Sequence, residues 1–311
     1  MIKAEFFVQL IGASFFLILN IYLAKQGFSD PEIANFISYR FLAVMLLAFP
    51  LGFYIKGKPL KPFFMLGSLG VPLVAIFLVV AVENAWYQYL PFSFILWGIV
   101  FTLFQVSSLP YVMRNTVAEN QSHAISLNYA THSFGTILSG IIIFGFGQFM
   151  QEIDEGIILL FIAFIGFFGV HFLLKMKVDM VVPVKKGLKW RSYDWVLLLK
   201  AIIPTLIIAV GAGLTIPFIN LFFYHNFEVD SSSFAVIGGV ASVLVAILAL
   251  LVPNVKNKLG FKKGITYTQT TAVIALIALA TTEFFANYWW AFLVAVLCFW
   301  IRTPLMNMAA P

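Results

Sequence analysis

The sequence predicts an all-α membrane protein, a bundle of two parallel six-helix halves of which ten transmembrane helices are present. Hydrophobic residues make up 62% of the 311 residues, and charged residues only 10%. Ten apolar stretches follow one another, each with about the 20 residues that a helix needs to cross the hydrocarbon layer. The loops between them alternate in charge, a pattern that no soluble fold explains.

The first six stretches predict helices at roughly 6–24, 33–55, 63–82, 90–112, 124–147 and 157–175. The first is long, contains Asn20 and ends without a small-x-small cleavage site, so we interpret it as a helix and not as a signal peptide. Four further stretches follow at roughly 196–224, 234–254, 264–285 and 288–310. The hydrophilic segment between the two sets predicts an N-terminal half at 1–176, a cytoplasmic linker at 177–194 and a second half at 195–311.

The charges of the loops predict the orientation. One set of loops is basic, with Lys56, Lys58 and Lys61, then Lys175 to Arg191, then Lys256, Lys258, Lys262 and Lys263. The opposite loops are acidic, with Asp30, Glu32, Glu83, Glu152, Asp154, Glu155, Glu228, Asp230 and Glu283. Because basic residues stay on the cytoplasmic side, we expect a multi-pass protein of the plasma membrane (the cell inner membrane) with its N-terminus in the cytoplasm. The net charge of +6 then reflects topology, and we expect no nucleic-acid partner.

An internal repeat indicates how the halves are related. An offset of 200 residues aligns Asn20 with Asn220, Asp30 with Asp230, Lys56 with Lys256, Lys58 with Lys258 and Glu83 with Glu283. Each pair falls at the same topological place, so the repeat keeps its orientation. This favours two parallel six-helix halves over inverted five-helix repeats.

With a slip of one residue, the repeat also aligns 101–110 with 302–311. The first half continues for about 65 residues beyond Pro110, whereas the sequence stops at Pro311. We therefore expect a C-terminally truncated sequence that lacks helices 11 and 12. The alternative is a natural ten-helix protein.

Three loop sequences resemble the major facilitator superfamily (MFS). Segments 50–58 and 253–263 stand where that family has its Gly-x-x-x-Asp-Arg-x-Gly-Arg-type loops, and 114–127 is similar to its loop between helices 4 and 5. Neither of the first two has the Asp that is usual there. The resemblance implies an MFS-type fold and a secondary transporter in which helices 1, 4, 7 and 10 line a cavity. Residues of these loops are the candidate gate: Lys56, Lys58, Arg114, Glu119, Lys256 and Lys258.

Polar residues inside the apolar stretches are candidate substrate ligands. Amide and imidazole side chains lie at helical spacing on stripes that we expect to point inward, namely Asn20, Gln105, Asn128, His132 and Asn220. Two cations join them, since Arg40 and Arg302 lie within membrane stretches where charge is costly. The alternative for each is a structural role, because polar side chains also hold membrane helices together.

The same inventory favours a transporter over an enzyme. No Asp or Glu lies deep in a stretch, which argues for a small polar or anionic solute and against the alternative, a drug/proton antiporter for multidrug efflux. An integral-membrane lipid-handling enzyme is a weaker alternative, because the acidic cluster at 152–155 has no His beside it. We expect no cofactor and no metal, protons as a candidate coupling ion, the lipid bilayer as surroundings, and a monomer.

Overall fold

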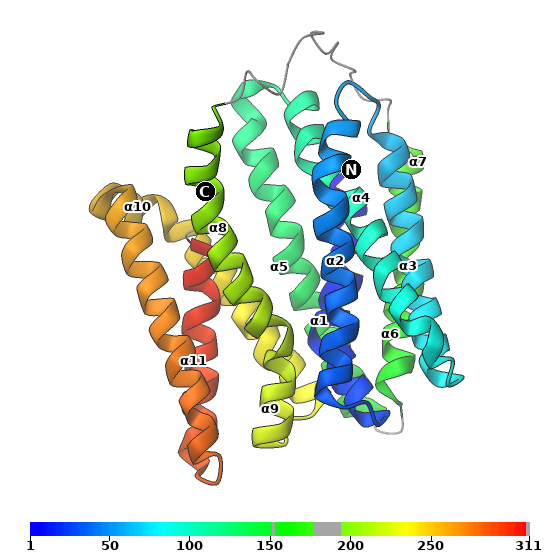
Figure 1. Ribbon diagram of the computed structural model, residues 1–311, viewed down its shortest axis with the longest axis vertical. Helices are drawn as coiled ribbons and strands as arrows, with labels where there is room; N and C mark the ends of the chain where they lie inside the picture. Colours follow the sequence, from blue (N-terminus) through cyan, green and yellow to red (C-terminus); the bar gives the residue numbers. More distant parts are fainter. Residues whose placement is uncertain (151–152, 177–193, 309–311) are drawn as a thin grey trace.

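The protein is a bundle of helices, and the computed structural model describes residues 1–150, 153–176 and 194–308. The first group of helices comprises α1 (Ile2–Lys25), α2 (Asp30–Tyr54), α3 (Lys61–Glu83), η1 (Tyr87–Tyr89), α4 (Leu90–Asn115), α5 (Ala118–Phe149), α6 (Glu155–Gly166) and α7 (Phe168–Leu174). The second group comprises α8 (Trp195–Thr215), η3 (Ile216–Phe218), α9 (Ile219–Phe227), α10 (Ser231–Thr281), η4 (Thr282–Phe285) and α11 (Trp289–Met308) (Figure 1).

The all-α membrane architecture is confirmed. Within the described ranges the chain has no strand, and ten helical segments are long and apolar enough to cross a membrane. They correspond in order to the ten predicted stretches. The predicted linker at 177–194 falls almost entirely outside the described residues.

Three predicted helices differ from the structure in their continuity. The stretch at 157–175 divides into α6 and α7 around Phe167. The stretch at 196–224 is interrupted by η3, where Pro217 has no backbone N–H to continue the helix. In α10 two predicted helices run together and meet at Gly260, whose φ of 72° breaks the helical path.

Acidic loop residues also begin the helices that follow them. Glu32 accepts a hydrogen bond of 2.8 Å from the backbone N–H of Ser29, which forms a capping box at the start of α2. Asp154 accepts one of 2.8 Å from the N–H of Glu155, and Asp230 one of 3.1 Å from that of Ser233. These carboxylates therefore mark the N-termini of α2, α6 and α10, where the helix dipole favours negative charge.

The helices approach one another closely at small residues. A Cβ atom on Gly98 of α4 would lie 2.4 Å from the carbonyl oxygen of Arg40 on α2. A Cβ on Gly135 of α5 would lie 3.1 Å from the backbone of Gln9 on α1. Small residues permit this spacing, which is how membrane helices gain packing contacts without a hydrophobic driving force.

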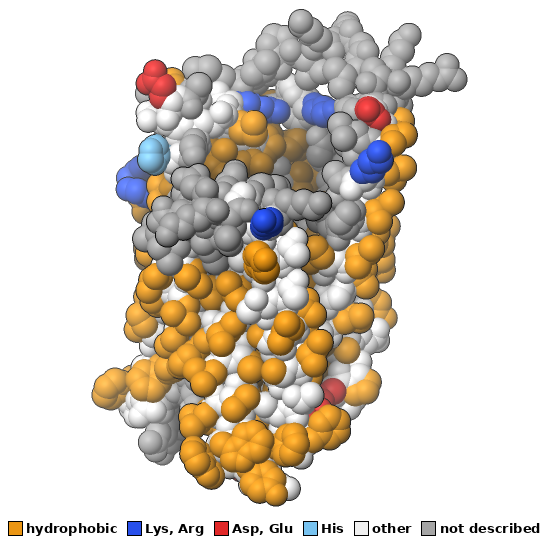
Figure 2. Space-filling view, turned by 90° about the vertical axis from the view of Figure 1, so that its left-hand side faces the viewer, with side chains coloured by type: hydrophobic (Ala, Val, Ile, Leu, Met, Phe, Trp, Pro, Cys, Tyr) orange, Lys and Arg blue, Asp and Glu red, His pale blue; other side chains and the backbone are white. Residues whose placement is uncertain are grey.

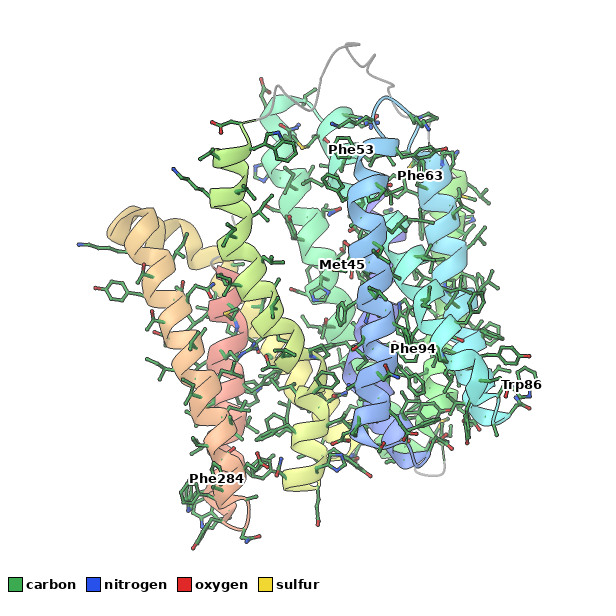
Figure 3. All side chains as sticks on the ribbon, in the orientation of Figure 1. Met45, Phe53, Phe63, Trp86, Phe94 and Phe284 are labelled. Carbon is green, nitrogen blue, oxygen red and sulfur yellow. The ribbon has the colours of Figure 1, made fainter. Side chains whose placement is uncertain are left out.

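We call the end of the bundle with Asp30, Glu83, Asp154 and Glu283 the acidic end, and the end with Lys56, Lys58 and Arg114 the basic end. The acidic end is at the bottom of Figure 1. Exposed aromatic side chains gather there, including Trp86, Tyr87, Phe284, Tyr288 and Trp289. Figure 3 shows Trp86 and Phe284 at this end, with Phe53 and Phe63 towards the other. Such aromatic belts are typical of the two membrane–water interfaces.

Candidate functional site

The two groups of helices contact each other towards the acidic end. Gly140 and Gly147 of α5 face α10, where added Cβ atoms would lie 2.8 Å from the carbonyl oxygen of Ala235 and 2.6 Å from the Cβ of Ser232. Gly140 is nine residues from the end of α5 at Phe149, about 14 Å at the helical rise. Near the basic end, Figure 2 shows a hollow between Lys and Arg side chains. The bundle is thus closed at one end and hollowed towards the other.

Asn20 and Asn220 meet at this closed contact. Nδ2 of Asn20 lies 3.1 Å from Oδ1 of Asn220 and also donates to the carbonyl oxygen of Pro217. Nδ2 of Asn220 donates to the carbonyl oxygens of Phe16 and Leu17, at 3.3 and 3.2 Å. Both residues are buried. Each amide group therefore uses both of its hydrogens to bind α1 to the break between α8 and α9.

Two polar contacts join the helix groups at the acidic surface. Glu155 at the start of α6 forms an ion pair with Lys25 of α1 and accepts a hydrogen bond of 2.8 Å from Ser231 of α10. His225 Nε2 of α9 lies 2.9 Å from Oδ1 of Asp30 at the start of α2. Burial and the adjacent Glu155 carboxyl raise the pKa of Asp154, which precedes α6. The pairing of Glu155 with Lys25 could not be predicted from the sequence, because it depends on how α1 and α6 are placed.

Arg40 lies in an aromatic environment between α2 and α4. Its guanidinium carbon is 4.8 Å from the ring centre of Trp97, 5.5 Å from that of Phe41 and 5.6 Å from that of Phe101. Nε of Arg40 is buried and has no hydrogen-bond partner among the described residues. The same holds for the indole Nε1 of Trp97. Two donors therefore lie close together without an acceptor.

A second polar cluster lies towards the basic end, on the same face of α4. Residues 97, 101, 105 and 108 follow one another at steps of four and three, which places them on one stripe. At the end of this stripe, the hydroxyl oxygen of Ser108 lies 3.0 Å from Oε2 of Glu5 and 2.7 Å from Oδ1 of Asn128. Glu5 is only 1% exposed. Glu5 precedes the first predicted stretch at 6–24, so its burial could not be anticipated from the sequence.

The remaining substrate candidates occupy separate places. Gln105 is half-buried on α4, and His132 is exposed on α5, one turn from the buried Asn128. Arg302 on α11 is 4% exposed and forms no ion pair with a carboxylate in the described part of the chain. The structure therefore brings together Asn20 with Asn220, and Asn128 with Ser108 and Glu5. It does not join Arg40 to Arg302.

The predicted gate residues of the first group surround the loop between α2 and α3. Arg114 at the end of α4 donates to the carbonyl oxygens of Lys58 and Ile55, at 3.0 and 3.3 Å. Nζ of Lys58 lies 3.1 Å from the ring centre of Tyr54, and Nζ of Lys56 lies 4.5 Å from that of Phe53. Glu119 is exposed at the start of α5. The side chains of Lys256 and Lys258 lie outside those that the structure describes.

Comparison with known proteins places this arrangement in a family. Residues 4–310 match the model described as Major Facilitator Superfamily. A mutant of the nucleoside transporter NupG is similar in structure, with a TM-score of 0.77 and 14% identity over 99% of this chain and 79% of that one. A search of curated proteins finds no match.

Two further solved structures are similar in fold. The D-xylose-proton symporter has a TM-score of 0.67 and 12% identity, over 99% of this chain and 79% of that one. A bacterial homolog of the human lysosomal transporter Spinster, in an inward-facing and unoccupied conformation, has a TM-score of 0.65 and 14% identity, over 98% and 72%. At such identities these likenesses describe the fold alone.

Proposed function

Because the chain belongs to the Major Facilitator Superfamily, we propose that it is a secondary transporter that moves a small polar or anionic solute across the plasma membrane by alternating access. Residues 1–176 and 195–311 are the two halves that move relative to each other. The chain acts as a monomer and needs no cofactor.

The unpaired donors at Arg40 carry the proposal. A buried N–H without an acceptor costs about 1–3 kcal/mol, so a site with two of them is favourable only if an acceptor arrives. The guanidinium fork matches a carboxylate or phosphate group, and its charge strengthens each hydrogen bond. The rings of Trp97 and Phe101 could meanwhile contact an apolar part of the solute. This chemistry suits an anionic solute, or a neutral one rich in acceptors.

Arg302 also favours a solute with negative charge. It is buried on α11 without an acidic partner among the described residues. A buried cation is expensive in a membrane protein and usually faces a cavity or a pathway. Arg40 and Arg302 belong to different halves, so both halves would supply positive charge to a solute bound between them.

The closed acidic end supports a direction of opening. If the basic loops face the cytoplasm, with the N-terminus on the same side, the described conformation opens inward. The opposite conformation then has to separate Asn20 from Asn220, Glu155 from Ser231 and Asp30 from His225. Gly140 and Gly147 leave no side chain at that contact, which favours a rocking movement.

Uptake by the purified chain in proteoliposomes tests the proposal. A panel of organic anions, neutral polar solutes and cationic dyes identifies the transported class. For that solute, Arg40→Ala should lower kcat/KM by roughly 10- to 150-fold, the loss expected for one hydrogen bond to a charged group. The kcat/KM of Arg40→Lys should lie between those of the wild type and Arg40→Ala, because lysine keeps the charge and lacks the planar guanidinium group.

Lys200→Gln is the matched control, since it removes one positive charge from an exposed position on α8. It should leave kcat/KM unchanged. Transport of cationic dyes with no competition by organic anions would favour the drug/proton antiporter and contradict the proposal. Full activity of Arg40→Ala would remove Arg40 from the site.

A further inference from the structure

Glu5 is a buried carboxyl group that the proposed function does not use. It lies 1% exposed on α1, its carboxyl oxygen 3.0 Å from the hydroxyl of Ser108 on α4. That hydroxyl is in turn 2.7 Å from Oδ1 of Asn128 on α5. Three helices therefore share one short chain of hydrogen bonds.

The hydroxyl hydrogen of Ser108 limits which of these hydrogen bonds can form together. The Ser108 hydroxyl has a single hydrogen, yet it lies between two oxygen atoms that both accept. If Glu5 is ionised, one of the two contacts joins acceptors with no hydrogen between them. If Glu5 is protonated, its O–H donates to Ser108 and Ser108 donates to Asn128, and every contact has its hydrogen. The geometry thus suits a neutral Glu5.

The ionised form has its own complete arrangement. A half-turn of the Asn128 amide places Nδ2 beside Ser108, so that Asn128 donates to Ser108 and Ser108 donates to the carboxylate. Loss of the proton therefore reverses the direction of both hydrogen bonds. No covalent bond to carbon forms or breaks, and the proton passes to and from water.

The charged and titratable groups on the surrounding elements do not hydrogen-bond to Glu5. They are the α-amino group of Met1 and Lys3 on its own side, Arg114 on α4, His132 on α5 and His171 on α7. Burial lowers the pKa of the Met1 amino group. Lys3 lies over the ring of Phe172, and Arg114 binds the carbonyl oxygens of Lys58 and Ile55. An ionised Glu5 would have hydrogen-bond donors in Ser108 and in the side chain of Gln9 on α1, with the Met1 amino group as the nearby positive charge.

We propose that Glu5, Ser108 and Asn128 form a proton-binding site that links the protonation of Glu5 to the packing of α1, α4 and α5. The exposed His132 on α5 and the half-buried Gln105 on α4 lie one helical turn from Asn128 and Ser108, so polar side chains continue beyond this site. Its role in coupling proton movement to transport rests on the proposed transport function. Its ability to bind a proton rests only on the geometry of the three side chains.

The first test needs no substrate. Infrared spectra of the full chain in liposomes are recorded from mildly acidic to mildly alkaline pH, and the C=O band of a protonated carboxyl group is followed. Glu5→Gln, which keeps the shape of the side chain, should abolish a band that titrates in the wild type. Glu228→Gln, at an exposed loop position, should leave it unchanged. A titrating band that persists in Glu5→Gln overturns the proposal.

Ser108→Ala tests the chain of hydrogen bonds while keeping the acid. The ionised carboxylate loses one of its donors, so the proton is held more strongly and the midpoint of the band should rise by about one pH unit. An unchanged midpoint overturns the role of Ser108. Gel filtration of both variants in detergent establishes that they fold.

The second test measures coupling. With a transported solute in hand, Glu5→Gln should lose accumulation driven by a pH gradient but keep exchange of labelled for unlabelled solute. Accumulation equal to the wild type overturns the coupling role. If the wild type transports no solute of any class, the proposed function fails, and the infrared result still decides whether the proton site exists.

Discussion

At the residue scale, the two asparagines differ from free substrate ligands because their hydrogens are already in use. Asn220 alone accepts from Asn20 and from the backbone N–H of Leu221, and donates to two carbonyl oxygens of α1. In this conformation we interpret the pair as a hydrogen-bonded contact that holds the two proposed halves together. A role in substrate binding would require the opposite conformation, in which these bonds are released.

Asn220→Ala should therefore favour opening at the acidic end. Removing three hydrogen bonds that exist only in the closed form, at a net 0.5–1.5 kcal/mol each, should shift the equilibrium towards the open form by at least about tenfold. Spin labels at Asn35→Cys and Glu228→Cys, in a Cys298→Ser background, report the separation of the two groups by pulsed electron resonance.

Asn226→Ala is the control, because Nδ2 of Asn226 donates within α9 to Phe222. It should leave the distance distribution as in the wild type. The shift in the double variant Asn20→Ala/Asn220→Ala should be smaller than the sum of the two single shifts, since each single change already breaks the shared hydrogen bond. Additive shifts would show that the two amides act independently.

At the element scale, the positions where helices touch could be anticipated only in part. The ten spanning segments follow from hydropathy and length, and the loop acids that mark them also cap α2, α6 and α10. The interruption at η3 has a local cause in Pro217. Which glycine meets which backbone depends on how each helix is rotated about its axis. Membrane segments in which most positions are apolar carry little information on this rotation.

Gly98→Ala should destabilise the contact between α2 and α4. The new Cβ would lie 2.4 Å from the Arg40 carbonyl oxygen and 2.9 Å from the Cβ of Ala43, so the helices have to separate. Overpacking of this kind costs about 1–3 kcal/mol. Thermal unfolding in detergent should show a Tm lowered by several degrees. Because Arg40 itself is displaced, the affinity for the solute should fall as well.

Gly145→Ala provides the comparison, since nothing lies within 4 Å of a Cβ at that position in α5. Its Tm should stay the same or rise slightly, because alanine favours the helix by up to about 1 kcal/mol over glycine. Equal losses of stability in both variants would mean that the close approach at Gly98 does not determine the result.

At the scale of the whole molecule, closure at the acidic end should be essential for transport. Gly147→Cys with Ser232→Cys, in the Cys298→Ser background, places two thiols where the Cβ atoms come within 2.6 Å, so a small relaxation reaches disulfide geometry. Oxidation should cross-link α5 to α10 and abolish uptake, and reduction should restore it. Electrophoretic mobility after cleavage in the segment between the two halves measures the cross-link.

Gly145→Cys with Ser232→Cys tests the specificity of that cross-link. Gly145 lies two residues from Gly147 on another face of α5, with open space beside it. Oxidation should produce no cross-link and no loss of uptake. Transport that continues while the 147–232 pair is fully cross-linked would contradict alternating access by rocking about this contact.

The sequence by itself determined the class of the protein, its ten membrane segments, the predicted orientation and the family. The class, the segments and the predicted orientation follow from hydropathy, length and loop charge, which act along the chain and need no knowledge of neighbours. The family follows from the resemblance of three loop sequences. The tertiary structure decided which polar groups meet: Asn20 with Asn220, Lys25 with Glu155, and Glu5 with Ser108. It also left Arg40 and Trp97 without acceptors. The free energy of a buried polar group depends on its partners from other helices. Its role can therefore be inferred only when the positions of those helices are known.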